Sequence, residues 1–198
     1  MRYDLTHIIP WVDEHSRVLD LGCGDGVFLR ALETQRGVTG LGIELDPENL
    51  IAAAKQGINV IQQDMDRGLD NLPSQSFDTV VMAHALQVLH HPHRVLKDMV
   101  RIGREAIVTF PNFGHWRCRL YLGFKGRMPV SRVLPYHWYD TPNIHLCTLK
   151  DFEALCAELN IEIITRDFTA ADNRGYLARW LPNVFGVTAV YRIRHRAG

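Results

Sequence analysis

The sequence predicts an α/β fold in which helices cover both faces of a mostly parallel sheet, and three observations support this prediction. Short β-rich runs alternate with segments of helical periodicity, which is the pattern of βαβ units. The first run ends in a turn with three glycines, as expected where a strand passes sharply into a helix. The chain has 198 residues, of which 46% are hydrophobic, so it can bury one sizeable core.

Five β-rich runs lie in the first 110 residues and are expected to form parallel strands. They are RVLDL (17–21), GLGIEL (40–45), INVIQQ (58–63), FDTVVMA (77–83) and EAIVTF (105–110). Two further runs, IEIITRDF (161–168) and VFGVTAVYRIR (184–194), are expected to pair with each other as an antiparallel C-terminal edge. The expected sheet therefore has seven strands.

Helix signals separate the strands. Asp46 before Pro47 and Thr148 three residues before Asp151 are typical N-caps, and the segment from His91-Pro92 opens a further helix that Gly103 ends. The side chains expected to face the sheet, helix by helix, are Phe28, Ala31 and Leu32; Leu50, Ile51 and Ala54; Val95, Leu96, Met99 and Val100; and Leu149, Phe152, Leu155, Cys156 and Leu159.

Residues 111–147 break this rhythm. The stretch is rich in aromatic residues, His, Arg and Pro, and it shows little periodicity, so we expect loop and short helix. Excursions of this length within a compact domain are usually functional or mobile. We refer to residues 111–147 as the excursion, within one expected domain that spans residues 1–198.

Composition narrows the function classes. No basic segment followed by a long apolar stretch is found, so we expect a cytoplasmic protein without a signal peptide or membrane span. Four scattered cysteines without CxxC spacing indicate reduced thiols. Residues 1–99 carry a net charge of −6 and residues 100–198 carry +6. The basic half is expected either to be a solvated face or to attract an anionic partner, and no nucleic-acid reader motif accompanies it.

The run VLDLGCGDG (18–26) contains the glycine turn. Gly22, Gly24 and Gly26 permit unusual backbone angles and a close approach of a ligand to the backbone, and the helix that follows offers unpaired N–H groups. The spacing is GxGxG and not the GxGxxG of dinucleotide folds, so the turn alone does not identify the ligand.

Acidic residues at the ends of three strands make the prediction more specific. Asp20 could face an ammonium group, Glu44 could accept from both hydroxyls of a ribose, and Asp64 could accept from an adenine amine with Met65 against the ring. An amino acid joined to an adenosine would satisfy all three carboxylates. NAD is the alternative ligand, although Asp20 would repel its pyrophosphate, and turn or cap roles are the structural alternative.

The motifs DLGCGDG, IELD, QQDMD and FDTVVMAHAL resemble the class I S-adenosylmethionine-dependent methyltransferases, whose Rossmann-like fold the chain is expected to share. PNFGHWRCRLYL, GRMPVS and WYDTPNIHLCT resemble the methionine biosynthesis protein MetW family over nearly the whole chain. The resemblance implies S-adenosylmethionine or S-adenosylhomocysteine as ligand and a homoserine O-acyltransferase as partner. The cofactor positions that it implies are Asp20, Gly22, Cys23, Gly24, Gly26, Glu44, Leu45, Asp64, Met65 and Ala83.

No methyl acceptor comes with this resemblance, so the catalytic residues stay unassigned. His84 is either a base near the methyl group or a loop residue, and His90, His91 and His93 lack the further ligands of a metal site. Two functions remain open: an accessory subunit of the acyltransferase, or a free-standing small-molecule methyltransferase. In the first, Trp116, Arg117, Trp138 and Tyr139 of the excursion would contact the partner; otherwise they pack a substrate pocket or core.

Overall fold

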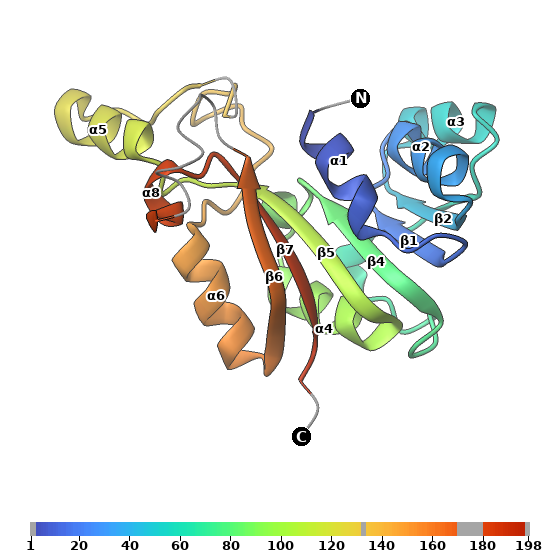
Figure 1. Cartoon of the computed structure of the whole chain (residues 1–198). Helices are drawn as coiled ribbons and strands as arrows, with labels where there is room; N and C mark the ends of the chain where they lie inside the picture. The colour runs from blue at the N-terminus through green and yellow to red at the C-terminus, as the bar shows by residue number, and fades with distance from the viewer. Residues whose placement is uncertain (1–2, 132–133, 170–179, 197–198) are drawn as a thin grey trace.

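The computed structural model describes residues 3–131, 134–169 and 180–196, and one seven-stranded sheet runs through them (Figure 1). The strands are β1 (Arg17–Leu21), β2 (Thr39–Glu44), β3 (Val60–Gln62), β4 (Phe77–Ala83), β5 (Gly103–Pro111), β6 (Ile161–Thr169) and β7 (Thr188–His195). Their order is β3-β2-β1-β4-β5-β7-β6. The first five strands are parallel, as predicted.

The two C-terminal strands pair antiparallel, which confirms the predicted pairing. β7 also pairs antiparallel with β5, so it lies one strand in from the edge, and β6 forms the edge itself. The mostly parallel seven-stranded fold class is thereby confirmed.

Helices cover both faces of the sheet (Figure 1). The described helices are α1 (Tyr3–Ile8), α2 (Val27–Arg36), α3 (Pro47–Lys55), α4 (Pro92–Ile102), α5 (Trp116–Lys125), α6 (Leu149–Glu158) and α8 (Pro182–Phe185), with short 3-10 turns η1 (Ile9–Trp11), η2 (Met65–Arg67) and η3 (Leu86–Val88). Val18 and Val81 pack on the side of α1, α2 and α3, whereas their neighbours Leu19 and Val80 pack on the side of α4 and α6. Alternate side chains of one strand therefore enter two separate cores, as in parallel sheets buried on both faces.

The predicted inner face of α3 is wrong by one or two residues. Ile51 and Ala54 are exposed, and Ala53 is the buried residue of this helix. A Cβ built at Gly26 would lie 3.0 Å from the Ala53 Cβ, so α3 packs closely on the glycine turn at Ala53. Ala53 belongs to the hydrophobic core that also holds Phe28 and Ile58.

In the described part of the excursion, α5 is followed by loop. In Figure 1, α5 projects away from the sheet beyond the ends of β5 and β6. No helix in the described part of the chain is long and apolar enough to cross a membrane.

Candidate functional site

A cavity of about 350 Å³ lies at the carboxyl ends of the first four strands. Its lining residues are Gly22, Gly24, Glu44, Leu45, Asn49, Asp64, Met65, Asp66, Ala83, His84, Ala85, Val88 and Leu89. β1 and β4 are adjacent, while the helices that follow them, α2 and α4, pack on opposite faces of the sheet. Ligands of open α/β sheets bind at such a topological switch point.

The glycine turn brings backbone directly to this cavity. The N–H of Gly22 donates to the Ile43 carbonyl at 2.8 Å, and Gly22 has a φ of +75°, which side-chain-bearing residues rarely adopt. A Cβ added there would also lie 3.1 Å from the Ala85 Cβ. Glycine at position 22 is therefore required both by its backbone angle and by the close approach of residues 84–89.

Glu44 closes β2 with its carboxylate held by backbone donors. Oε2 accepts from the Gly24 N–H at 2.7 Å, and Oε1 accepts from the N–H groups of Leu45 and Asp46 at 2.8 and 2.9 Å. A carboxylate can accept about four hydrogen bonds, so three backbone donors leave about one acceptor position for a ligand. The side chain is thus preorganised at the rim of the cavity.

Asp64 and Asp66 flank Met65 in the sequence, and their carboxylates have different hydrogen-bond partners. Asp64 Oδ1 accepts from the Asp66 N–H at 3.0 Å. Asp66 accepts from the N–H groups of His90 and His91 at 3.0 and 2.8 Å, which ties η2 to the start of α4. Although partial burial opposes it, these backbone donors lower the pKa of Asp66. Asp66 is therefore an anchor for the cavity wall that the sequence did not reveal.

Three of the ten predicted cofactor positions lie outside the cavity lining. Asp20 is 2% exposed, and no described residue donates a hydrogen bond to it. Burial, together with the nearby charge of Glu44, raises the pKa of Asp20 to about 7. Burial, with a further effect of Asp20, raises the pKa of the Cys23 thiol to about 12, and Gly26 is the N-cap of α2. These three residues belong to the end of β1 and the glycine turn, but they do not line the cavity.

His84 follows β4 directly and lines the cavity. Its φ is +60°, a strained value for a residue other than glycine, and its N–H donates to the Thr109 carbonyl at 2.9 Å. Strained backbone of this kind is concentrated at binding and catalytic sites. His84 is consequently the lining residue best placed to carry a chemical role.

Several residues that line the cavity were not predicted from the sequence. Asn49 lies in the first turn of α3, and Ala85, Val88 and Leu89 surround η3. The position of Asn49 just after the IELD motif was the one signal that could have revealed it. Among the described residues, no group of three His, Cys, Asp or Glu side chains is placed to hold a metal ion.

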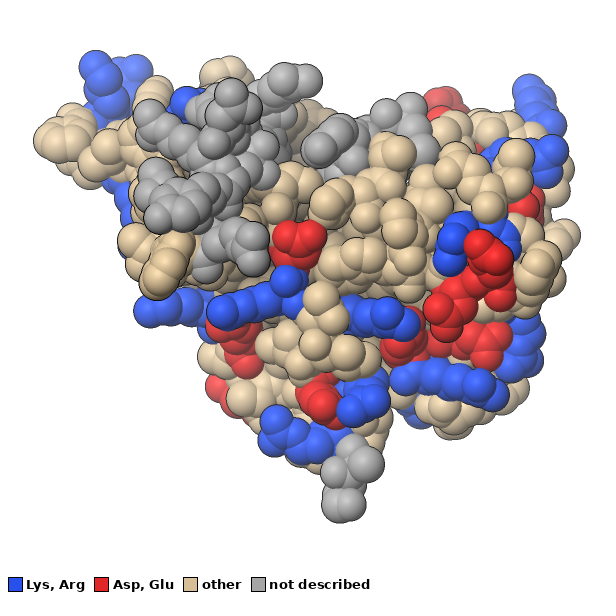
Figure 2. All heavy atoms as spheres, viewed as in Figure 1, with Lys and Arg blue, Asp and Glu red and all other residues tan. Residues whose placement is uncertain are grey.

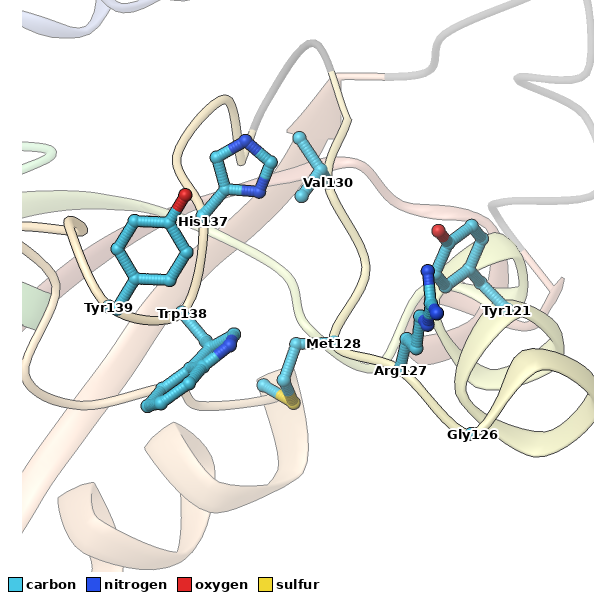
Figure 3. Close-up of a pocket in the computed structure, with 8 residues that line it drawn as sticks. All are labelled: Tyr121, Gly126, Arg127, Met128, Val130, His137, Trp138 and Tyr139. Atoms are coloured by element: carbon cyan, nitrogen blue, oxygen red, sulfur yellow. The ribbon is translucent and has the colours of Figure 1, made fainter.

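The excursion forms a second cavity of about 620 Å³, lined by Tyr121, Gly126, Arg127, Met128, Val130, His137, Trp138 and Tyr139 (Figure 3). Trp138 and Tyr139 are 75% and 69% exposed, and Phe124 of α5 is 84% exposed. Trp116 is half-buried beneath the Arg117 guanidinium, whose central carbon lies 5.4 Å from the ring centre. Of the four predicted contact residues, Arg117, Trp138 and Tyr139 are therefore exposed.

The model of the family "Methionine biosynthesis protein MetW" matches residues 2–193. The chain belongs to the MetW family. The bifunctional methionine biosynthesis protein MetXA/MetW of Rhodopirellula baltica is 33% identical to this MetW-family chain over 181 residues, or 87% of the chain. The match spans 29% of the length of that bifunctional protein.

Solved structures agree on the fold. An S-adenosylmethionine-dependent methyltransferase from Mesorhizobium loti is similar with a TM-score of 0.69 at 19% identity, over 97% of this chain and 96% of that chain. The cyclase SpnF is similar with a TM-score of 0.69 at 17% identity, over 98% of this chain and 82% of that chain. These likenesses place the MetW-family chain in the methyltransferase fold, as predicted.

Proposed function

We propose that this chain binds S-adenosylmethionine in the cytoplasm and acts as an accessory subunit that regulates a homoserine O-acyltransferase of methionine synthesis. The observation that carries the ligand proposal is the single cavity that unites Gly22, Gly24, Glu44 and Asp64. The partner proposal rests on the MetW family and on the relative in which MetXA and MetW share one polypeptide.

The lining residues fit an amino acid joined to an adenosine. In this proposal the remaining acceptor position of Glu44 takes a ribose hydroxyl, while Asp64 accepts from the adenine amine and Met65 packs against the ring. The methionine part lies over the glycine turn, and its ammonium group favours the ionised form of Asp20, whose pKa burial raises to about 7. The sulfonium of S-adenosylmethionine is a reactive methyl donor when bound.

The fold does not by itself require methyl transfer, because SpnF shares it and is named a cyclase. A regulatory ligand needs only to favour one of two forms of the protein. The exposed aromatic side chains of the excursion, with Arg117 and Arg127 nearby, are of the types that dominate the centres of protein interfaces. In the accessory proposal, this excursion contacts the acyltransferase.

The experiment combines the purified chain with a homoserine O-acyltransferase and measures acyl transfer with and without S-adenosylmethionine. We expect the two proteins to co-elute in size-exclusion chromatography and S-adenosylmethionine to change the rate of acyl transfer. Calorimetry on the isolated chain measures the ligand affinity separately. A chain that neither co-elutes nor alters the acyltransferase would exclude the accessory role, even if it binds the ligand.

A free-standing small-molecule methyltransferase is the second candidate, and the strained His84 at the cavity favours it. In this case, labelled methyl from S-adenosylmethionine should appear in a metabolite extract incubated with the protein. The variant His84→Ala should abolish the transfer if His84 is the base. An extract that stays unlabelled would leave the accessory role as the function of this site.

A further inference from the structure

Both ends of the excursion meet at one buried side chain, that of Gln87. Its Nε2 donates to the Pro111 carbonyl at 3.2 Å and to the Cys147 Sγ at 3.6 Å, and Gln87 is 2% exposed. Pro111 is the first residue of the excursion and Cys147 is the last. The Gln87 carbonyl also accepts from the N–H groups of Ile144 and His145 at 2.8 and 3.0 Å. One residue therefore fastens both ends of a 37-residue segment that spans residues 111–147.

The same residue is the centre of a wall of the ligand cavity. Gln87 is the middle residue of η3, and Ala85, Val88 and Leu89 around it line the cavity. The Val88 N–H donates to the Ala85 carbonyl at 3.2 Å, which holds these residues together in one turn. η3 thus faces the ligand cavity with some of its residues and holds the excursion with another.

The cavity leaves η3 little freedom on its ligand side. The Ala85 Cβ would lie 3.1 Å from a Cβ at Gly22, so η3 packs closely on the glycine turn. A ligand lying over this turn must contact residues 85–89 or displace them. Ligand binding in the cavity should therefore change the packing or the position of η3.

Two buried side-chain oxygens in this region lack a hydrogen-bond partner in the described part of the chain. Gln87 Oε1 and Thr109 Oγ1 are buried, and neither has a hydrogen-bond partner among the described residues. An unpaired buried acceptor disfavours the arrangement that contains it, which brings a second arrangement of this region closer in energy.

Any movement at Gln87 would also reach the excursion, because Gln87 holds both of its ends. The Phe113 N–H donates to the Cys147 carbonyl at 3.1 Å, which closes the neck of the segment next to Gln87. The exposed Phe124 belongs to α5, which projects away from the sheet (Figure 1), and the exposed Trp138 lies in the loop that returns from α5 to the neck. A rotation at the neck would therefore move α5 relative to the sheet.

We infer that Gln87 is a positioning residue that transmits occupancy of the ligand cavity to the excursion. This inference rests on the proposed function, because it takes S-adenosylmethionine as the ligand and the excursion as the partner surface. Its role is coupling and not ligand contact, so removal of the Gln87 amide should uncouple the two regions while the ligand still binds.

Hydrogen–deuterium exchange of the full chain, with and without saturating S-adenosylmethionine, tests the inference. The variant Gln87→Met keeps side-chain length and removes the amide donor. Its matched control is Gln75→Met, because Gln75 Nε2 also donates to a backbone carbonyl at 3.2 Å, that of Gly103, at the opposite end of the strands. Cys147→Ala is a milder second variant that removes one acceptor of the Gln87 amide.

In the wild type and in Gln75→Met, the ligand should slow exchange both around the cavity and at residues 143–147. In Gln87→Met, we expect ligand affinity within about twofold of wild type and protection around the cavity, but at least about a fivefold smaller effect at residues 143–147. Cys147→Ala should show a smaller loss in the same direction, and it carries the test if Gln87→Met fails to fold.

Two different failures are distinguishable. If the wild type binds S-adenosylmethionine and Gln87→Met transmits the full effect to residues 143–147, the inference is wrong and the proposed function stands. If the wild type binds no S-adenosylmethionine, the proposed ligand is wrong and the inference falls with it.

Discussion

Asp20 is a carboxyl group whose charge the folded protein disfavours. Burial and the nearby Glu44 raise its pKa from 3.8 to about 7. Between pH 3.8 and about pH 7, the unfolded state has released the Asp20 proton while the folded state still holds it. The contribution of Asp20 to stability is therefore full below about pH 4 and is lost as the pH rises through about 7.

Asp20→Asn should remove this dependence. Relative to Asp20→Asn, the wild type should lose about 2–3 kcal/mol of unfolding free energy between about pH 5 and about pH 8. Urea unfolding of both proteins at the two pH values measures the difference. Parallel stability curves for the two proteins would show that Asp20 is ionised at both pH values.

Glu44 is the residue whose loss should most affect the ligand. Glu44→Ala should weaken S-adenosylmethionine binding by about 1–3 kcal/mol, because a charged acceptor at the cavity rim is lost. Glu44→Gln retains one acceptor oxygen and should have a smaller effect. Calorimetry gives the affinities, and thermal unfolding separates them from the stability lost with three backbone hydrogen bonds. Unchanged affinity in a folded Glu44→Ala variant would refute the ribose role.

At the scale of single elements, α6 begins at a capping box. The Asp151 N–H donates to Thr148 Oγ1 at 3.3 Å, and the Thr148 N–H donates to Asp151 Oδ2 at 2.9 Å. Thr148→Ala should therefore lower the unfolding free energy by about 1 kcal/mol. Thr34→Ala is the control, because the Thr34 hydroxyl donates within α2 to the Arg30 carbonyl and caps no helix end. Equal urea midpoints for the two variants would contradict the role of the cap.

Local signals explain which elements the sequence could predict. The caps at Asp46 and Thr148 depend on residues within three positions, so they can be read directly from the chain. The close packing of Ala53 of α3 on the distant Gly26 is a non-local contact, and the local hydrophobic pattern carries no trace of it. The partners of Asp66 are equally non-local, because His90 and His91 lie 24 and 25 residues away.

At the scale of the whole molecule, alternating strands and helices predicted the parallel sheet and therefore the edge at which the ligand cavity forms. This is why seven of the ten predicted cofactor positions line one cavity. The position of β7 between β5 and β6 could not be predicted, because it depends on pairings with strands far apart in sequence. The cavity of the excursion could not be predicted either, since most of its lining residues lie in loops without periodicity.

Charge is distributed unequally over the same molecule. No acidic residue occurs between positions 106 and 139, where the excursion carries Arg117, Arg119, Lys125 and Arg127 on its described surface. Figure 2 shows Lys and Arg side chains at the outer end of α5, without an acidic side chain beside them in this view. A partner that fits this surface presents apolar and acidic side chains, so long-range attraction should guide its association.

Binding of the homoserine O-acyltransferase should therefore depend on both Trp138 and salt. Trp138→Ala should weaken the complex by about 2 kcal/mol or more, because an exposed tryptophan in contact with a tyrosine ring, here that of Tyr139, is typical of an interface centre. Raising NaCl from about 50 to about 300 mM should lower the association rate for wild type and variant alike, because surface charges are screened. Ile51→Ala is the control, since Ile51 is 51% exposed and belongs to α3, which lies on the opposite side of the molecule from α5 (Figure 1). Interferometry on the immobilised acyltransferase measures the affinity and the association rate.

If Trp138→Ala and Ile51→Ala bind equally well, the partner contacts another surface, and the exposed aromatic side chains of the excursion need a different explanation.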